Sequence, residues 1–253
     1  MLLTLDIGNS NITIGAYENE KLVFTARLKT DRQKTENQYA IEILEIFKLY
    51  VKDFGFSGSI ISSVVPELTE IIKIAVKDVT GTEPIVIGPG LKTGLNISSN
   101  NAGEIGADLI AGAVGTACKY PLPAIVIDLG SATKMYIVSE NREFVGGMIA
   151  PGIRISMDAL SKECSQLPTV SLTAPKKSIS LNTSECMKSG IVFGFASLVD
   201  GMLERFINEY GEVKTVVATG GLSKPIISNC KNKISLDENL ILDGLKAIYD
   251  KNA

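Results

Sequence analysis

Short runs of alternating apolar and polar residues open the chain, and the same arrangement returns in its middle. Residues 3–30 and 124–153 each read as strand, tight turn, alternating strand, polar turn and third apolar run. Period-two alternation over so few residues indicates half-buried β-strands. The sequence therefore predicts a duplicated three-stranded unit. Its first copy has strands at about 2–8, 11–17 and 21–29.

Helical periodicity follows the first three strands. Thr35–Gln38 has the form of a capping box, and apolar residues then recur every three or four positions through Val51. A buried strand over 59–65, a helix over 67–78 and a short strand at 84–87 complete this part. Strands that alternate with helices predict an α/β fold with parallel strand pairs.

The second half repeats this mixture after a turn-rich segment at 88–103. We therefore expect two duplicated actin-like (ribonuclease H-like) lobes, residues 1–100 and 101–253, each a mixed sheet flanked by helices. Helices are predicted at about 105–119, 158–167, 183–210 and 238–250, and a buried strand at 214–218. The buried stripe of the long helix is predicted at Met187, Ile191, Phe195, Leu198, Met202 and Phe206.

Composition narrows the chemistry. The chain has 253 residues and a net charge of -3, so a nucleic-acid partner is not expected. It has no histidine, so the commonest general base is missing. Carboxylates, hydroxyls, backbone amides and a hard metal ion remain, and phosphoryl transfer suits that inventory. No apolar run approaches the ~18 residues of a membrane span, no export signal opens the chain, and the four cysteines are widely spaced. A cytoplasmic protein with reduced thiols, away from membranes, is predicted.

Each copy of the repeated unit carries Asp-x-Gly at the end of its first strand. Asp6-Ile7-Gly8-Asn9-Ser10 could hold Mg²⁺ through Asp6 and water, with the following amides and hydroxyls facing phosphate oxygens. The alternative is an ordinary hairpin with a capping Asp. In the second copy, Asp128 follows a buried run, where a bare carboxylate is costly unless it is paired or metal-bound. Two such hairpins facing each other could hold the phosphates and metal of a nucleotide.

Four further segments are candidates for a site, each with a structural alternative. Asp108 in Gly106-Ala107-Asp108 is either a helix-terminal carboxylate or a catalytic base. Asn182-Thr183 reads as a helix N-cap whose amides could also bind a substrate carboxylate. Thr219-Gly220-Gly221 could support a flat purine or ribose, or simply turn from strand to helix. Gly146–Gly152 reads as a loop pressed against something, or as a bulge and turn.

Taken in order, these segments resemble the type III pantothenate kinases of the acetate-kinase/Hsp70/actin superfamily, across essentially the whole chain. The resemblance implies phosphorylation of pantothenate by ATP to 4'-phosphopantothenate, the first step of coenzyme A biosynthesis. It also implies Mg²⁺, a monovalent cation (K⁺ or NH₄⁺) and a homodimer. The matching segments are Asp6–Ser10, Ser63–Pro66, Thr93–Leu95, Gly106–Asp108, Asp128–Thr133, Gly146–Gly152, Asn182–Thr183 and Thr219–Leu222.

The same resemblance implies roles for individual residues. Asp108 would be the general base on the pantothenate hydroxyl, Asp6 would bind metal, and Asp128 would coordinate the monovalent cation. Pantothenate would contact Gly106, Ala107, Leu109 and Thr183. The nucleotide would contact Asp6, Gly8, Asn9, Ser10, Asn11, Gly130, Ser131, Ala132, Thr133, Gly220 and Gly221.

Departures from the family pattern gather on the acceptor side. Leu109 stands where the family has Arg, and Leu cannot replace a cation that faces an anionic substrate. The family's Asn-Pro is absent at 99–102, and Lys134-Met135-Tyr136 stands for Thr-Phe-Asp. Ser131 replaces a threonine but keeps its hydroxyl. Two interpretations follow: a pantothenate kinase in which Lys134 or another cation supplies the lost charge, or a nucleotide-binding protein with another hydroxyl acceptor or a regulatory, non-catalytic role.

Overall fold

The chain forms two compact units. The computed structural model describes residues 1–52, 55–97 and 105–253. The first unit comprises Met1–Cys118 with Leu240–Ala253, and the second comprises Lys119–Asn239. The C-terminal segment thus returns to the first unit, so these units differ from the predicted lobes 1–100 and 101–253.

A five-stranded mixed sheet forms the centre of the first unit. Its strand order is β3-β2-β1-β4-β5, in which β1 pairs antiparallel with β2 and parallel with β4. The predicted strands and their mixed pairing are confirmed. The bounds are β1 Leu2–Ile7, β2 Asn11–Glu18, β3 Lys21–Lys29, β4 Gly58–Ser63 and β5 Ile85–Val86.

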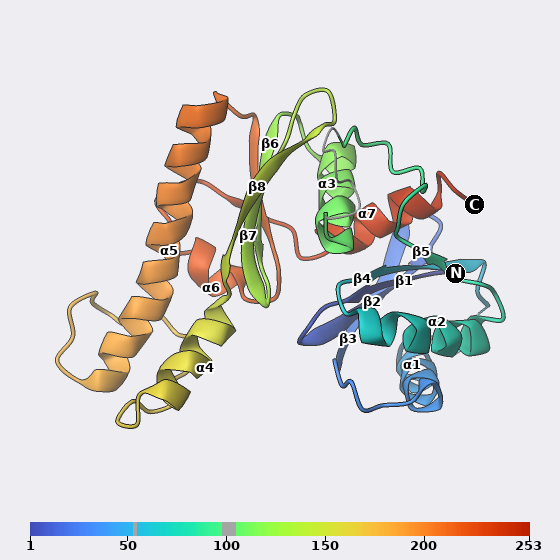
Figure 1. Cartoon of the computed structure of the whole chain (residues 1–253), viewed down its shortest axis with the longest axis horizontal. Coiled ribbons are helices and arrows are strands. Elements are labelled where there is room, and N and C mark those ends of the chain that lie inside the picture. The colour runs from blue at the N-terminus through green and yellow to red at the C-terminus, as the bar shows by residue number, and fades with distance from the viewer. Residues whose placement is uncertain (53–54, 98–104) are drawn as a thin grey trace. The chain divides into compact units, whose positions relative to one another are not determined.

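Helices cover both faces of this sheet, so its central strands β1 and β4 are buried on both sides. Leu3, Leu5 and Ile7 of β1 belong to a core shared with α1 (Glu36–Tyr50) and α2 (Pro66–Thr80). The alternate β1 residue Leu2 lies in a second core with α3 (Ala107–Lys119) and α7 (Leu240–Tyr249). Figure 1 shows α1 and α2 on one side of the sheet and α7 on the other. This packing explains why α3 and α7 join the first unit.

Helices α3 and α7 touch through glycine. A Cβ on Gly244 would overlap the Ala111 carbonyl, and one on Gly115 would overlap the Leu240 carbonyl. We expect Gly244→Ala to lower the free energy of unfolding by about 1–3 kcal/mol, because backbone cannot yield as a flexible side chain does. Gly194→Ala is the matched control, since Gly194 is a helical glycine with nothing within 4 Å of its Cβ position. It should gain about 0.5–1 kcal/mol in urea unfolding, and equal effects of both changes would contradict this packing.

The second unit repeats the first sheet. Its strand order is β10-β9-β6-β7-β8, with β6 antiparallel to β7 and parallel to β9. Strand β6 therefore corresponds to β1, β7 to β2, β8 to β3 and β9 to β4. The predicted duplication is confirmed at the level of topology. The bounds are β6 Ala124–Leu129, β7 Ala132–Val138, β8 Phe144–Pro151, β9 Thr215–Thr219 and β10 Ser235–Leu236.

Two helices of this unit differ from the prediction, one in its bounds and one in its buried face. Helix α4 spans Ile153–Glu163 rather than 158–167, because β8 ends at Pro151 and the next residue, Gly152, is already the N-cap of the helix. Helix α5 spans Thr183–Tyr210 as predicted, but the second half of its buried stripe is rotated. Its residues Val192, Ala196, Val199 and Leu203 are buried in place of Phe195, Leu198, Met202 and Phe206. A short α6 (Ser223–Ile227) completes the unit.

Helix α5 is also long and apolar enough to meet the length and composition of a membrane span. In its most apolar 18-residue window, 44% is buried inside the chain. The buried side of α5 packs with β6 and β7 in the core of the second unit. We therefore read α5 as a core helix of its unit, and Figure 1 shows it lying along that sheet.

Candidate active site

The first Asp-x-Gly hairpin places Asp6 at the carboxyl end of β1. Asp6 lies opposite Thr13 of β2 and beside Ser62 of β4 in the strand register. The Ser62 hydroxyl donates to Asp6 Oδ1 at 2.9 Å. Asp6 is partly exposed, so this bond orients a carboxylate that solvent can reach. Ligands of open α/β sheets bind at this end of the strands.

A short loop follows, and it presents polar groups to solvent. The Gly8 amide donates to the Asn11 carbonyl at 3.0 Å, and a Cβ on Gly8 would lie 3.1 Å from that oxygen. Glycine is therefore favoured where the chain turns most tightly. Asn9, Ser10 and Asn11 are exposed. Their side chains and amides can donate to an anion beyond the sheet edge.

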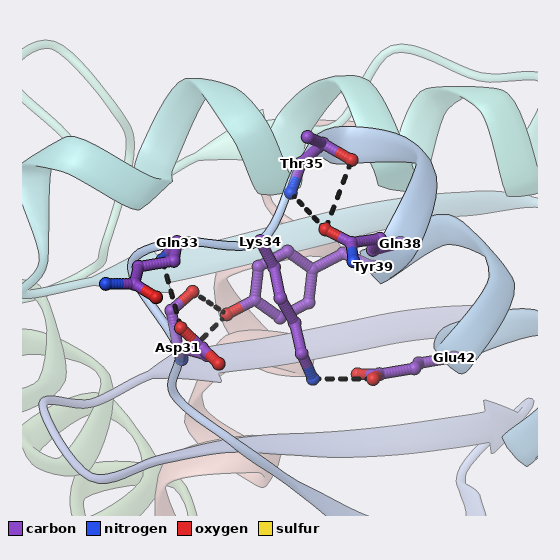
Figure 2. Close-up of polar contacts among 7 residues, drawn as sticks. All are labelled: Asp31, Gln33, Lys34, Thr35, Gln38, Tyr39 and Glu42. Carbon is purple, nitrogen blue, oxygen red and sulfur yellow. Dashed lines mark hydrogen bonds and ion pairs between the residues drawn. The ribbon is translucent and has the colours of Figure 1, made fainter.

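The connection from β3 to α1 braces this loop. The Thr30 hydroxyl donates to the Gly8 carbonyl at 2.6 Å, and the Arg32 guanidinium donates to Asn9 Oδ1 at 2.9 Å. Figure 2 shows how the connection itself is held: the Tyr39 hydroxyl accepts from the Asp31 amide at 2.9 Å and donates to the Asp31 carbonyl at 2.8 Å. The buried Tyr39 ring thus anchors the segment that carries Thr30 and Arg32.

Removing the Tyr39 hydroxyl should loosen this bracing. We expect Tyr39→Phe to cost about 1–3 kcal/mol of unfolding free energy, because two backbone groups of Asp31 lose their partner. It should also raise the Kd for ATP, which isothermal titration would measure. Lys48→Met is the control, since the exposed Lys48–Glu45 ion pair of the same helix lies outside the connection. An unchanged Kd in Tyr39→Phe would contradict a bracing role.

The second hairpin contains a buried ion pair. Asp128 at the end of β6 lies opposite Lys134 of β7, and Lys134 Nζ is 2.6 Å from Asp128 Oδ2. The two side chains are 12% and 8% exposed for Lys134 and Asp128, respectively. The buried carboxylate is therefore paired, which was one of the two outcomes expected from its burial.

Glycines surround the other side of the Asp128 carboxylate. A Cβ on Gly220 would lie 2.8 Å from Asp128 Oδ1, and one on Gly130 would lie 3.3 Å from it. Gly220 has a φ of 97°, a conformation that favours glycine. The Leu222 amide then donates to the Leu129 carbonyl at 3.4 Å. The Thr219–Leu222 turn therefore folds over the end of β6, which brings Gly220 to Asp128, while Gly221 is exposed.

The residues that follow Gly130 differ in access. Ser131 and Ala132 are partly exposed, whereas Thr133 is fully buried. Thr133 Oγ1 has no hydrogen-bond partner within the described part of the chain. Gly152, where β8 passes into α4, lies against the Ser131 carbonyl so closely that a Cβ would overlap it. The Gly146–Gly152 segment is thus mostly strand, and its last glycine supports the hairpin loop.

Asp108 occupies the first turn of α3. Its Oδ1 accepts from the Leu109 amide at 2.8 Å, so the carboxylate folds back over the helix N-terminus. A Cβ on Gly106 would lie 2.7 Å from that oxygen and 3.7 Å from a Val64 methyl. The Val64 amide in turn donates to the Ile7 carbonyl at 3.0 Å. Gly106 therefore lies near both the Asp108 carboxylate and Val64, and Val64 is bonded to the end of the strand that carries Asp6.

The remaining predicted acceptor residues fall in both units. Ala107 and Leu109 flank Asp108 and are partly exposed. Thr183 is the exposed first residue of α5, after the N-cap Asn182, whose Oδ1 accepts from the Glu185 amide at 2.9 Å. Thr183 borders a cavity of about 750 Å³ between α4 and α5, lined largely by apolar side chains. The family position at 99–102 lies outside the described residues.

Four neighbours of the site have contacts that the sequence did not predict, although Gly152 and Lys134 had already been noted there. Ser62, Arg32 and Gly152 had sequence signals: a hydroxyl at the end of a buried strand, a basic residue after the third strand, and a glycine after proline. Lys134 was noted as a departure from the family, but not as the partner of Asp128. Among the described residues, no group of three or more His, Cys, Asp or Glu side chains is placed to hold a metal ion.

Two mixed sheets of one topology, each with Asp-x-Gly at the end of its first strand, place the chain in the actin-like α/β fold class. Solved structures share this fold. A protein from Campylobacter jejuni described as a Baf family transcriptional activator matches with a TM-score of 0.61 and 24% identity, over 99% of this chain and 98% of that one. The activator of 2-hydroxyisocaproyl-CoA dehydratase from Clostridium difficile, with bound ADPNP, matches with a TM-score of 0.54 and 13% identity, over 98% and 93%.

The chain belongs to the type III pantothenate kinase family, whose family model matches residues 2–205. A type III pantothenate kinase from Halalkalibacterium halodurans is 42% identical over 100% of both chains. One from Geotalea uraniireducens is 42% identical over 100% of this chain and 99% of its own. The resemblance inferred from the motifs is thereby confirmed, and the chain is a kinase that transfers phosphate to an alcohol group.

Proposed function

We propose that this protein phosphorylates pantothenate with ATP, giving 4'-phosphopantothenate in the first step of coenzyme A biosynthesis. The observation that carries the proposal is the 42% identity to type III pantothenate kinases along the entire chain. The Asp6 and Asp108 carboxylates support it, because Gly106, next to Asp108, lies near Val64, which is bonded to the strand end that carries Asp6. ATP is a cytoplasmic substrate, so we place the activity in the cytoplasm.

Each unit has its own candidate phosphate contacts in its hairpin loop. Exposed Asn9, Ser10 and Asn11 would donate to phosphate oxygens from the first unit. From the second unit, the partly exposed Ser131 is a better-placed hydroxyl than the buried Thr133. Gly220 and Gly221 would give the nucleoside a flat backbone surface.

Asp6 fits a magnesium ion held through water. Its carboxylate is partly exposed and already oriented by Ser62, and hard oxygen donors are what Mg²⁺ prefers. When bound, the ion would neutralise charge on the phosphates. Asp128 does not fit as a ligand of a free monovalent cation, because its Oδ2 is already paired with Lys134 at 2.6 Å.

Asp108 would accept the proton of the pantothenate hydroxyl. The Leu109 amide orients its Oδ1, and Gly106 leaves the space that this carboxylate occupies. Gly106, Ala107, Leu109 and Thr183 would contact the substrate. The transferred phosphoryl group passes through a loose transition state, so the positioning of hydroxyl and base carries much of the catalysis.

Leu109 favours a second candidate, a kinase for another hydroxyl acceptor. Leu109 is the residue directly after Asp108, and its apolar side chain has neither a charge nor a hydrogen-bond donor for a substrate carboxylate. A non-catalytic regulatory protein would instead bind ATP without turnover.

Release of ADP with ATP and Mg²⁺, with and without pantothenate, separates these functions. The proposal expects pantothenate-dependent release. Turnover with other hydroxy acids or polyols, but not with pantothenate, would establish the second candidate. Binding of ATP without acceptor-dependent turnover would establish the regulatory role.

We further propose a homodimer. The second unit exposes large apolar side chains on β8 and α4, among them Val145, Ile149 and Ile155, which are 47%, 71% and 53% exposed. Exposed apolar surface of this kind commonly marks a protein interface. Sedimentation velocity would show a dimer, and a monomer at micromolar concentration would contradict the proposal.

A further inference from the structure

The ion pair between Lys134 and Asp128 is fixed by the strand pairing. The two residues lie directly opposite each other in the β6–β7 register, and Nζ reaches Oδ2 at 2.6 Å. Both side chains are at least 88% buried, since they are 12% and 8% exposed. A charge-assisted hydrogen bond of this length is among the stronger kinds found in proteins.

Both oxygens of the Asp128 carboxylate have close neighbours in the second unit. The ammonium is bonded to Oδ2, while Oδ1 occupies space that a side chain at Gly220 or Gly130 would need, 2.8 and 3.3 Å from their respective Cβ positions. A free cation at Asp128 would have to sit beside the Lys134 ammonium. Like charges repel strongly where water is scarce, so the ammonium excludes such an ion.

The fold itself does not require a lysine at this position. In the duplicated first hairpin, the residue opposite the corresponding Asp6 is Thr13. Strand β2 pairs normally with β1 and β3 around that threonine. Lys134 is therefore a feature of this site rather than of the architecture.

We propose that the Lys134 ammonium is a built-in monovalent cation, so that this kinase works without added K⁺ or NH₄⁺. The inference rests on the proposed pantothenate kinase activity. A lysine ammonium has the single charge and the N–H donors of NH₄⁺, and three donors allow one group to pair with a carboxylate and also contact a phosphate oxygen. Because the Lys134 ammonium is covalently part of the chain, the protein does not need to bind a monovalent cation from solution.

Lys134→Thr tests this, because it introduces the residue that the first hairpin tolerates at the same register. The assay is pantothenate-dependent ADP release in tetramethylammonium buffer, with K⁺ or NH₄⁺ added at constant ionic strength. We expect less than about a twofold response from the wild-type protein. The variant should lose about tenfold or more without K⁺ and regain much of it with K⁺ or NH₄⁺. The proposal would be overturned if the wild-type protein required K⁺ for turnover, or if K⁺ did not change the turnover of the variant.

Melting temperature supplies a readout independent of turnover. K⁺ should raise the Tm of Lys134→Thr above that in tetramethylammonium and leave the wild type unchanged, since an ion that binds only the folded state stabilises it. Lys246→Thr is the control: Lys246 is 11% exposed and pairs with Glu20 and Asp250 in the first unit. It should melt earlier without any K⁺ response. If pantothenate gives no turnover with any cation, the proposed function fails, while the absence of a K⁺-dependent Tm in Lys134→Thr overturns this inference.

Discussion

Asp108→Asn is expected to lower kcat for pantothenate phosphorylation by about 10²–10⁴-fold. The amide keeps the size of the carboxylate but cannot take up the proton of the acceptor hydroxyl. The Kd for ATP should change little, because the nucleotide contacts are assigned to the hairpin loops. Steady-state ADP release and titration calorimetry measure the two quantities separately.

Asp78→Asn serves as the control for this change. Asp78 lies on α2, a helix that packs on the face of the sheet opposite α3. Its replacement should leave kcat within about twofold. If Asp108→Asn kept wild-type kcat, Asp108 would be only a helix-terminal carboxylate, and the base would have to be sought elsewhere.

Asp128→Asn is expected to lower the free energy of unfolding by about 3–5 kcal/mol, because it leaves the Lys134 charge buried and uncompensated. Activity should fall with it, since the hairpin would rearrange around the unpaired ammonium. Urea unfolding followed by circular dichroism measures the stability. The double variant Asp128→Asn with Lys134→Met should lose much less unfolding free energy than the sum of the losses in the two single variants.

A more solvent-accessible ion pair provides the comparison for Asp128. Glu185 and Lys188 of α5 lie 2.8 Å apart, and their side chains are 34% and 23% exposed. Glu185→Gln should cost less than about 1 kcal/mol, because solvent screens such pairs. Similar losses in Asp128→Asn and Glu185→Gln would show that the buried pair has no special role in the second unit.

Much of the fold could be predicted because the apolar pattern is strong. The three opening strands, the long helix at 183–210 and the last helix follow from periodicity, and the repeated Asp-x-Gly revealed the duplication. The start of α4 was misplaced because proline and glycine at 151–152 favour a loop, whereas Gly152 caps the helix directly. The buried stripe of α5 was predicted one position off because this helix has apolar residues on more than one side: Ala196 is buried, whereas Phe195 is only partly buried.

The candidate site was less accessible to sequence reasoning because it depends on register. Four residues separate the last paired positions of β1 and β2, but only three separate those of β6 and β7. That difference places Lys134 opposite Asp128, whereas Thr13 lies opposite Asp6. A lysine six residues after an aspartate gives no such signal by itself. Ser62 reaches Asp6 only through the parallel pairing of β1 with β4, which sequence spacing does not reveal.

Formation of 4'-phosphopantothenate by this chain can be observed directly. The purified protein is incubated with ATP, Mg²⁺ and pantothenate, beside Asp108→Asn at the same concentration, and the product is identified by ³¹P NMR and mass spectrometry. We predict a phosphomonoester with the mass of phosphopantothenate from the wild-type protein and only a trace from the variant. Bound ATP with no phosphorylated pantothenate, or equal product from both proteins, would contradict the account.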